Sequence, residues 1–265
     1  MYNPTISVIT VCYNSEKFIE RTVKSVLQLK SVIHDLEYII IDGNSKDGTL
    51  AKLEKYKDAI DIIVSEPDKG IYDAMNKGVS KAKGNWVCFM NSGDCFYKPH
   101  DLKGLTDILN SNENKKVVYG NWVIDFGDKQ VKRVASPIER LEVSMPFNHQ
   151  ASFARTAELR LHQFDLQYKI VADFNFFYHI YRAQGRSAFL HTDLTIAICD
   201  ATDSTSFNNM FDIDIEHHKI TSDNKNLHWR IDGVKIAIKR ILGKITGDRN
   251  VRLNPFWKLK EFKEQ

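Results

Sequence analysis

The amino-acid sequence predicts an α/β domain with a Rossmann-like, mostly parallel sheet and flanking helices, followed by a helical basic tail. Apolar strand-like runs alternate with segments of helical apolar spacing as far as residue 90, and each run ends in a polar turn. The charge then changes along the chain. Residues 217–265 contain 12 Lys and Arg against 5 Asp and Glu, whereas residues 1–216 contain 25 against 29. We therefore expect a main domain over 1–216 and a basic extension over 217–265.

Four strands and three helices are expected to alternate at the start of the main domain. Their order is strand 6–11, helix 16–29, strand 38–41, helix 49–57, strand 60–64, helix 71–82 and strand 86–90. β-branched residues fill the strand-like runs, and the helical segments repeat apolar residues three and four positions apart. Gly, Asn, Asp and Ser separate them, as is typical of turns. Strands joined through helices form right-handed parallel crossovers, which predicts a doubly wound sheet.

Length and composition fit this architecture. The chain has 265 residues, of which 43% are apolar and 27% charged, so it can bury a sizeable core. Its four cysteines have neither metal-ligand nor disulfide spacing, and we expect reduced thiols. No apolar run approaches the roughly 20 residues of a membrane-spanning helix, and no secretion signal is recognisable. We therefore expect a cytoplasmic protein.

Carboxylates lie just beyond the predicted strands, where an open parallel sheet collects the polar groups that hold a nucleotide. Asp42 follows three isoleucines and precedes Gly43, whose missing side chain lets a ligand approach the backbone. Asp94 ends the turn after the fourth strand, and a carboxylate there can bind a hard divalent ion on a diphosphate. One such Asp alone is usually a turn or helix cap. Three polar turns in one unit instead favour a nucleotide-linked ligand.

Four segments carry a resemblance to a known family: SVITVCYN at 7–14, IDGNSKDGT at 41–49, SEPDKGIYDAMNKG at 65–78 and NSGD at 91–94. Together they resemble the inverting glycosyltransferases of family 2, which have the GT-A fold and use nucleotide-diphosphate sugars. The branch that builds bacterial surface polysaccharides, including colanic-acid-type enzymes, is the most similar. MPFNHQ at 145–150 and VAD at 171–173 resemble later landmarks more loosely. The resemblance implies a nucleotide-binding half over 1–100 and an acceptor-binding half over 101–216.

The resemblance also implies a role for each matching residue. The nucleotide-sugar-binding set would be Val11, Tyr13, Asn14, Asp42, Asp68, Lys69, Asn76, Asn91, Ser92 and Gly93. Within it, Val11, Tyr13 and Asn14 would flank the base that Asp42 contacts and Asp68 encloses. Asp94 would bind Mg²⁺ or Mn²⁺ on the diphosphate, and Asp173 would be the general base. The acceptor contacts would be His149 and Gln150.

The implied activity is a hexosyltransferase-like single displacement with inversion. The donor would be a nucleotide-diphosphate sugar, with uridine diphosphate favoured and guanosine diphosphate left open. The acceptor would be a sugar hydroxyl of a polysaccharide or lipid-linked oligosaccharide precursor. The chain departs from the family at two points: Asp94 is the single carboxylate of its turn, and Met75 stands where many relatives have Arg. Lys69 or Lys77 would then supply a cation near the phosphates.

Other classes of protein fit less well. A nicotinamide dehydrogenase or a nucleotidyltransferase would favour a glycine-rich loop after the first strand, but residues 12–16 contain no glycine. A non-catalytic nucleotide-sugar-binding or assembly protein would keep Asp42 but need not keep Asp94 or Asp173. The presence of both favours an enzyme.

The basic extension has the pattern of an amphipathic helix. Its apolar residues at helical spacing are Val234, Ala237, Ile238, Ile241, Leu242 and Ile245, and its basic residues are Lys235, Lys239, Arg240 and Lys244. Such a helix can lie on an anionic membrane surface, which would place the protein peripherally on the inner face of the cytoplasmic membrane. Packing against the main domain is an equally good interpretation. Nucleic acid binding is the weakest alternative, and we expect no nucleic acid partner.

Overall fold

The computed structural model describes residues 5–202, 210–223, 229–230 and 233–239. The chain divides into two compact units, Met1–Ser204 and Thr205–Gln265. Helix α8 (Met210–Ile220) runs across position 216, so the boundary lies earlier than the charge pattern predicted. The division follows the end of the last sheet strand, since strand pairing defines the compact unit and surface charge does not.

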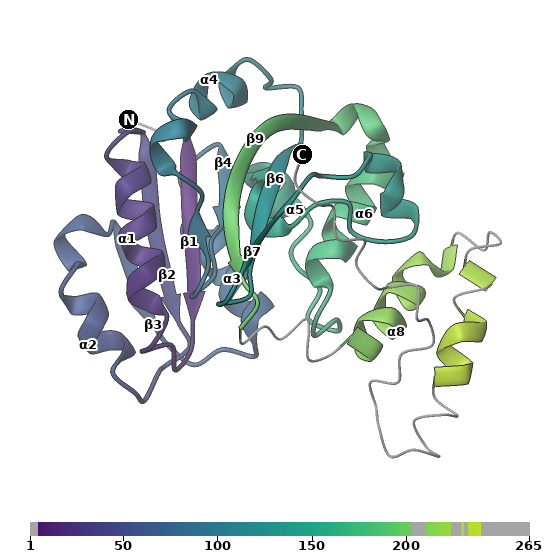
Figure 1. Cartoon of the computed structure of the whole chain (residues 1–265), viewed down its shortest axis with the longest axis horizontal. Coiled ribbons are helices and arrows are strands. Elements are labelled where there is room, and N and C mark those ends of the chain that lie inside the picture. Colours follow the sequence, from purple (N-terminus) through teal and green to yellow (C-terminus); the bar gives the residue numbers. More distant parts are fainter. Residues whose placement is uncertain (1–4, 203–209, 224–228, 231–232, 240–265) are drawn as a thin grey trace. The chain divides into compact units, whose positions relative to one another are not determined.

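The first unit alternates strands and helices before it becomes more irregular (Figure 1). Its strands are β1 (Ile6–Cys12), β2 (Leu36–Asp42), β3 (Ile62–Ser65), β4 (Trp86–Phe89), β5 (Cys95–Phe96), β6 (Val117–Asp125), β7 (Gln130–Arg133), β8 (Ser152–Arg155) and β9 (Phe189–Asp200). Its α-helices are α1 (Ile19–Lys30), α2 (Thr49–Glu54), α3 (Ile71–Lys81), α4 (Leu105–Asn110), α5 (Thr156–Leu161) and α6 (Ala172–Gln184). Short 3₁₀ turns are η1 (Lys57–Ala59), η2 (Pro99–Leu102), η3 (Ile138–Glu142), η4 (His149–Ala151) and η5 (Arg186–Ala188).

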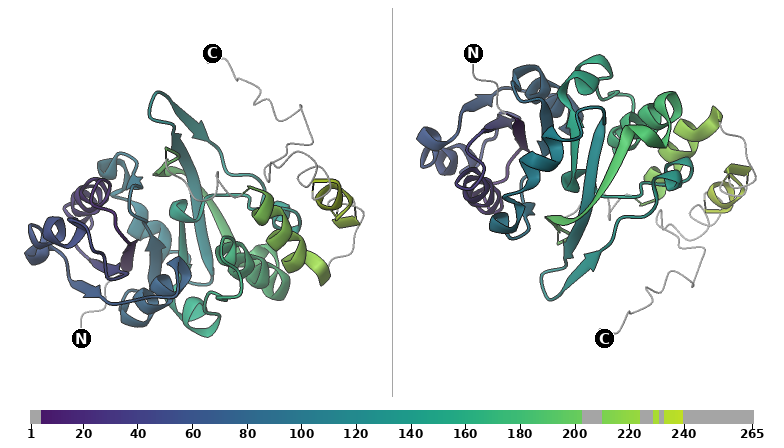
Figure 2. Two further views of the ribbon diagram at one scale, coloured as in Figure 1. Left: turned by 90° about the horizontal axis from the view of Figure 1, so that it is seen from below. Right: turned by 90° about the horizontal axis from the view of Figure 1, so that it is seen from above.

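All strands of the first unit join one nine-stranded sheet in the order β3-β2-β1-β4-β8-β6-β9-β5, with β7 paired to β6. The β1–β4 strands run parallel, as the sequence predicted, and so do β6 and β9. β8 lies antiparallel between β4 and β6. Figure 2 shows the β6–β7 hairpin projecting beyond the other strands in both views. The carboxyl ends of β1, β2 and β4 therefore meet at one edge.

Helices α1 and α3 cover opposite faces of the β1–β2 region. The apolar side of α1, including Val23 and Val26, joins a core with Val8 and Ile40. On the other face α3 approaches so closely that a Cβ on Gly78 would lie 2.5 Å from Ile9 Cγ2. Only glycine permits this spacing, which brings the N-terminus of α3 to the polar edge of the sheet.

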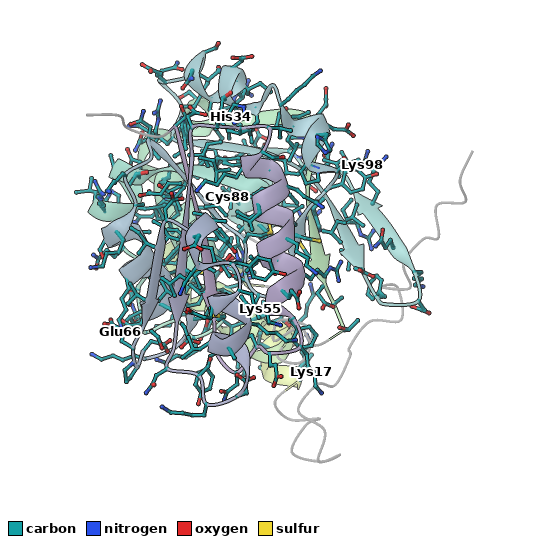
Figure 3. The ribbon with its side chains drawn as sticks, turned by 90° about the vertical axis from the view of Figure 1, so that its left-hand side faces the viewer. Lys17, His34, Lys55, Glu66, Cys88 and Lys98 are labelled. Atoms are coloured by element: carbon teal, nitrogen blue, oxygen red, sulfur yellow. The ribbon has the colours of Figure 1, made fainter. Side chains whose placement is uncertain are left out.

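The interior of the first unit is apolar, as the composition predicted. All four cysteines lie in strands, where they are buried and free. Figure 3 shows Cys88 among the strands and Lys17 and Lys98 toward the outside of the molecule, where both are exposed. The aromatic residues of α6 that the spacing assigned to the core, Phe174, Phe176, Phe177 and Tyr178, are all buried. This packing fixes the orientation of α6 and with it that of Asp173 in its first turn.

The second unit contains α8, the 3₁₀ turn η6 (Thr221–Asp223) and helical residues 229–230 and 233–239. Trp229 stacks on the His218 ring with centroids 4.3 Å apart, and Lys239 pairs with Asp214. Within 233–239 Ile236 is buried, whereas Val234 and Ile238 are 60% and 42% exposed. The remainder of the predicted amphipathic helix lies outside the described residues.

None of the helices in the described part of the chain is long and apolar enough to cross a bilayer.

Candidate active site

Asp42 ends β2 and holds the first polar turn together. Its carboxylate accepts hydrogen bonds from Ser45 Oγ, from Ser45 N at 3.0 Å and from Ser65 Oγ at 2.6 Å. The residue has no exposed surface. A buried carboxylate with these partners cannot contact a base, so the direct contact expected from the sequence is corrected. Asp42 instead positions the turn that carries Gly43 and Asn44.

An open aromatic face and a carboxylate lie on either side of Gly43. A Cβ at this glycine would collide with Asp68 Oδ2 and lie 3.3 Å from the Tyr13 ring. Tyr13 is 62% exposed, and Asp68 accepts the Gly70 N–H at 2.8 Å. The fold thus brings together three residues from three segments. Their arrangement can stack a flat ring and accept its N–H group.

Asn14 and Val11 hold neighbouring turns in place. Asn14 has a positive φ of 47°, and its side-chain oxygen accepts the Lys46 N–H at 2.9 Å. Val11 is buried in β1, and its carbonyl accepts the Ser92 N–H at 3.3 Å. Each residue accepts a hydrogen bond from a neighbouring turn. Its role is therefore to hold the backbone of that turn, whose side chains can face a ligand.

Asp94 lies beyond β4 at the centre of the site. Its Oδ1 accepts the Asp200 N–H at 2.8 Å, and its Oδ2 accepts Gln150 Nε2 at 2.6 Å. Burial raises the pKa of Asp94 to about 6, although both hydrogen bonds oppose the rise. Gly93, with φ of 102°, donates its N–H to Thr22 Oγ1 at 2.9 Å and allows this tight turn. The turn thus holds a carboxylate in an environment that disfavours its charge.

Three buried oxygens around Asp94 have no hydrogen-bond partner: Asn91 Oδ1, Ser92 Oγ and Gln150 Oε1. Only five buried side-chain nitrogen or oxygen atoms without a partner occur among the described residues, and three of them belong to this site. Buried polar groups are rarely left unpaired without a ligand to pair with. Carboxylate, amide and hydroxyl oxygens are also the donor types that Mg²⁺ and Mn²⁺ prefer. The site therefore has suitable donors for a divalent cation, although the described residues contain no cluster of three His, Cys, Asp or Glu side chains that could bind one.

Asp173 sits in the first turn of α6 with its side chain 16% exposed. Oδ1 accepts the Tyr72 hydroxyl at 2.9 Å, and Oδ2 lies 3.1 Å from His149 Nδ1. Burial raises the pKa of Asp173, but the hydrogen bond and electrostatic attraction from His149, together with the Tyr72 hydrogen bond, outweigh it, and the pKa lies below its ordinary value. Asp173 is consequently an ionised carboxylate at neutral pH that can accept a proton from a bound hydroxyl.

A continuous set of contacts connects the two carboxylates. His149 Nε2 lies 3.2 Å from Asn91 Nδ2, in the turn that carries Asp94. The next residue, Gln150, contacts Asp94 itself. The fold thus assembles three segments that are distant in the sequence. The sequence did not predict a role for Tyr72. It lies inside the family-like segment 65–78, and its hydroxyl is the feature that could have indicated a contact to a carboxylate.

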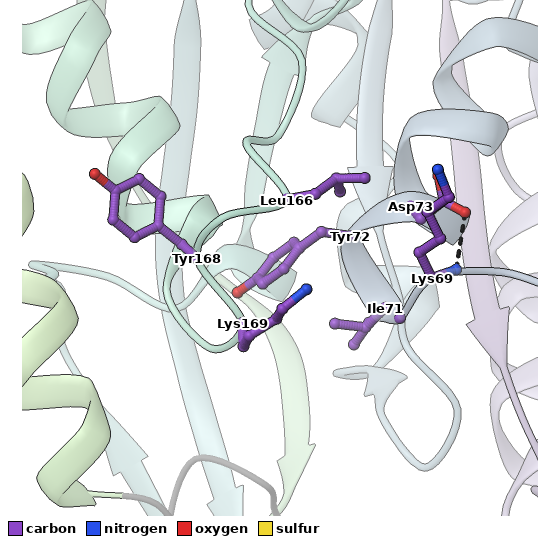
Figure 4. Close-up of a pocket in the computed structure, with 8 residues that line it drawn as sticks. Lys69, Ile71, Tyr72, Asp73, Leu166, Tyr168 and Lys169 are labelled. Atoms are coloured by element: carbon purple, nitrogen blue, oxygen red, sulfur yellow. Dashed lines mark hydrogen bonds between the residues drawn. The ribbon is translucent and has the colours of Figure 1, made fainter.

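A small pocket lies beside Asp173, lined by residues 69–73 at the start of α3 and by Leu166, Tyr168 and Lys169 (Figure 4). Tyr72 lines this pocket and contacts Asp173, so the pocket adjoins that carboxylate. Lys69 is exposed at its rim, and its backbone N–H donates to Asp73 at 3.0 Å. Lys77 is paired with Glu66 at 2.9 Å, which leaves Lys69 as the better candidate for a phosphate contact.

Asn76 does not reach the ligand side of the site. Its amide nitrogen donates to Phe164 O and its oxygen accepts Phe164 N, both at 2.9 Å. Both ends of the side chain are therefore used to hold the loop before α6. The donor contact expected of Asn76 is corrected, because the backbone of the loop between α5 and α6 occupies its polar atoms.

Solved structures share this fold. The mannosyltransferase PcManGT of Pyrobaculum calidifontis, in complex with GDP-Man and Mn²⁺, superposes with a TM-score of 0.67 over 93% of this chain and 77% of its own, at 14% identity. S. aureus TarS 1–349, in complex with UDP-GlcNAc, gives a TM-score of 0.58 over 82% and 66%, at 18% identity. The fold is that of the GT-A glycosyltransferases.

Sequence comparison then identifies the family. The model for glycosyl transferase family 2 matches residues 7–183. A glycosyltransferase of Mycobacterium tuberculosis is 34% identical over 182 residues, which are 65% of this chain and 67% of its own. The TuaG protein of Bacillus subtilis, assigned by name to teichuronic acid biosynthesis, is 40% identical over 100 residues, or 37% and 39%. The chain belongs to glycosyl transferase family 2 and is a glycosyltransferase.

Proposed function

We propose that this enzyme transfers a sugar, with inversion, from a nucleoside-diphosphate donor to a hydroxyl of a saccharide or lipid-linked saccharide. The observation that carries the proposal is the continuous network between Asp94 and Asp173, with unpaired oxygens around Asp94. A single displacement requires a carboxylate on each side of the sugar, one near the leaving group and one near the acceptor.

The nucleotide and the pathway are inferred from relatives. TarS is described with UDP-GlcNAc and PcManGT with GDP-Man, and we favour a uridine diphosphate donor. The similarity to TuaG over 100 residues supports a role in building a bacterial surface polysaccharide. A colanic-acid-type product is the more specific form of this proposal. Tyr13, Gly43 and Asp68 would hold the base.

Asp94, with Asn91, Ser92 and Gln150, would hold Mg²⁺ or Mn²⁺, which when bound neutralises the charge that develops on the departing diphosphate. Asp173 accepts the proton of the acceptor hydroxyl, whose oxygen attacks the anomeric carbon from the face opposite the diphosphate. The bond from that carbon to the diphosphate breaks, and its electron pair leaves with the nucleoside diphosphate. Lys69 supplements the positive charge near the phosphates.

A donor panel tests the function. UDP-glucose, UDP-galactose, UDP-N-acetylglucosamine and GDP-mannose are screened by thermal shift with Mn²⁺, and nucleotide release is then followed for each. We expect one donor to raise the melting temperature and to be turned over slowly with water. Binding without any release would favour the non-catalytic assembly protein, and no binding at all would refute the proposal.

Gly43→Ala tests the base pocket. The new Cβ would displace the Asp68 carboxylate and crowd Tyr13, so we expect the affinity for UDP to fall about tenfold or more while the fold persists. Calorimetric titration with UDP measures it. Gly104→Ala is the matched control, because nothing lies within 4 Å of a Cβ there. Equal affinities of both variants would remove Gly43 and Asp68 from the pocket.

Membrane association through the second unit is a separate part of the proposal. Val234 and Ile238 are exposed one helical turn apart, with Lys235 between them. An apolar stripe beside basic residues suits an anionic membrane surface, which would place the enzyme at the inner face of the cytoplasmic membrane. Co-sedimentation with phosphatidylglycerol vesicles is expected for the full chain and for V234D/I238D to a lesser extent. Equal sedimentation of both would refute this part.

A further inference from the structure

We infer that His149 is a positioning residue which couples the general base Asp173 to the turn that holds the leaving diphosphate. The inference rests on the proposed function and deepens it. It replaces the acceptor contact that the sequence suggested for His149, and it assigns a shared task to His149, Gln150 and Asn91. The inference is carried by the contacts of the two ring nitrogens and by the backbone that orients the ring.

Both nitrogens of the His149 ring have protein partners. Nδ1 lies 3.1 Å from Asp173 Oδ2, and Nε2 lies 3.2 Å from Asn91 Nδ2. Since the ionised Asp173 can only accept, Nδ1 carries a proton, and Nε2 is left to hydrogen-bond the Asn91 side-chain amide. No ring nitrogen remains for an acceptor sugar. The partners thus define the direction of the ring and place a proton on Nδ1.

The backbone around His149 is held on both sides. The Asn148 side chain caps η4 by accepting the Gln150 N–H at 3.0 Å, and the His149 carbonyl accepts the Ser152 hydroxyl at 2.7 Å. Before the turn, Phe147 is buried and stacks on Tyr119 with centroids 4.4 Å apart. The direction of the His149 side chain is therefore set by a packed 3₁₀ turn.

Two adjacent residues of this turn contact the two carboxylates of the site. His149 contacts Asp173 and Gln150 donates to Asp94 at 2.6 Å. Asn91 closes the arrangement, because it belongs to the Asp94 turn and contacts His149. The spacing between the base and the leaving-group side is thereby determined by one rigid turn. Such positioning matters because attack requires the base, the acceptor oxygen and the anomeric carbon in line.

The coupling has a spectroscopic signature that needs no substrate. In protein labelled with ¹⁵N-histidine, the His149 signals, identified by their loss in His149→Gln, should report a ring protonated at Nδ1. Asp173→Asn should change this pattern, because its amide removes the acceptor for the Nδ1 proton. A ring whose Nδ1 carries no proton, and whose signals are unaffected by Asp173→Asn, would overturn the inference, whether or not the proposed activity is found.

A double-mutant cycle tests the coupling in turnover, measured as nucleotide release from the donor selected in the panel. His149→Ala should lower turnover ten- to a hundredfold with the donor KM nearly unchanged, because the base loses its orientation. His149→Gln should restore part of the rate, since its amide can donate to Asp173. In the Asp173→Asn background, His149→Ala should lower turnover by less than about a further twofold. Multiplicative losses, or a donor KM effect alone, would overturn the inference.

Discussion

Asp173→Asn is expected to lower turnover on the order of a hundredfold or more, because general base catalysis typically contributes that much. The substitution keeps the shape of the side chain and its acceptance of the Tyr72 hydroxyl, and it removes the basicity. UDP affinity should change little, since the residues proposed to hold the nucleobase, around Gly43, belong to other segments. Nucleotide release and calorimetric titration with UDP measure the two quantities.

The matched control is Asp107→Asn. Asp107 also lies in the first turn of a helix, α4, but it is exposed. Both variants remove one carboxylate from a helix N-terminus, which costs a few tenths to about 1 kcal/mol of stability. Only Asp173→Asn should therefore affect turnover. A nearly unchanged rate in Asp173→Asn would refute its role as the base.

Asp94→Asn is expected to have opposite effects on activity and stability. It removes the one carboxylate of the proposed cation site. The increase in UDP affinity that Mn²⁺ produces should therefore be at least about tenfold smaller. Turnover should fall about a hundredfold to a thousandfold, as when other transition-state charge stabilisers are lost. The apo protein should nevertheless become more stable at pH 7.5.

The stability effect follows from the sign of the pKa shift. Burial raises the pKa of Asp94 from 3.8 to about 6, so folding favours the protonated form. The stabilisation is fully present below about pH 4 and is lost as the pH rises through about 6. At pH 7.5 the ionised group thus destabilises the apo protein by at most about 3 kcal/mol. An amide at this position can donate to Gln150 Oε1 once the Gln150 amide turns over, in place of accepting from its Nε2. We expect the melting temperature to rise by about 2–5 °C.

Glu158→Gln is the contrasting control. Glu158 is buried like Asp94, but its carboxylate lies 2.7 Å from Lys116 Nζ and is compensated. Loss of its charge leaves a lysine without its partner, so this variant should be less stable and should bind UDP normally. If Asp94→Asn also destabilised the protein between pH 7 and 8, the conclusion that the buried charge of Asp94 destabilises the apo protein would be wrong.

Much of the first half of the fold could be predicted from the sequence, because its signals are local. The β-branched runs became β1 to β4, and the helix over 71–82 was found at Ile71–Lys81. The antiparallel insertion of β8 between β4 and β6 could not be predicted. Its sequence, Ser152–Arg155, is four residues long, and its position depends on pairing with strands far along the chain.

The candidate site divides in the same way. The sequence analysis selected Asp94, His149, Gln150 and Asp173, and the fold places all four in one network. It did not find the burial of Asp42, the loop contacts of Asn76 or the Tyr72 hydroxyl on Asp173. These features depend on which loop packs over which strand end. A residue type and its spacing contain no information about that.

The sequence by itself determined the family, the order of the elements as far as β4 and the residues able to do acid–base and cation chemistry, because these depend on side-chain types and short-range periodicity. The tertiary structure decided which of those residues face one another. Asp94 and Asp173 are 79 positions apart, and only the packing of the η4 turn between them connects the two. Since burial and hydrogen-bond partners arise from such long-range packing, the opposite pKa shifts of these two carboxylates are also properties of the fold.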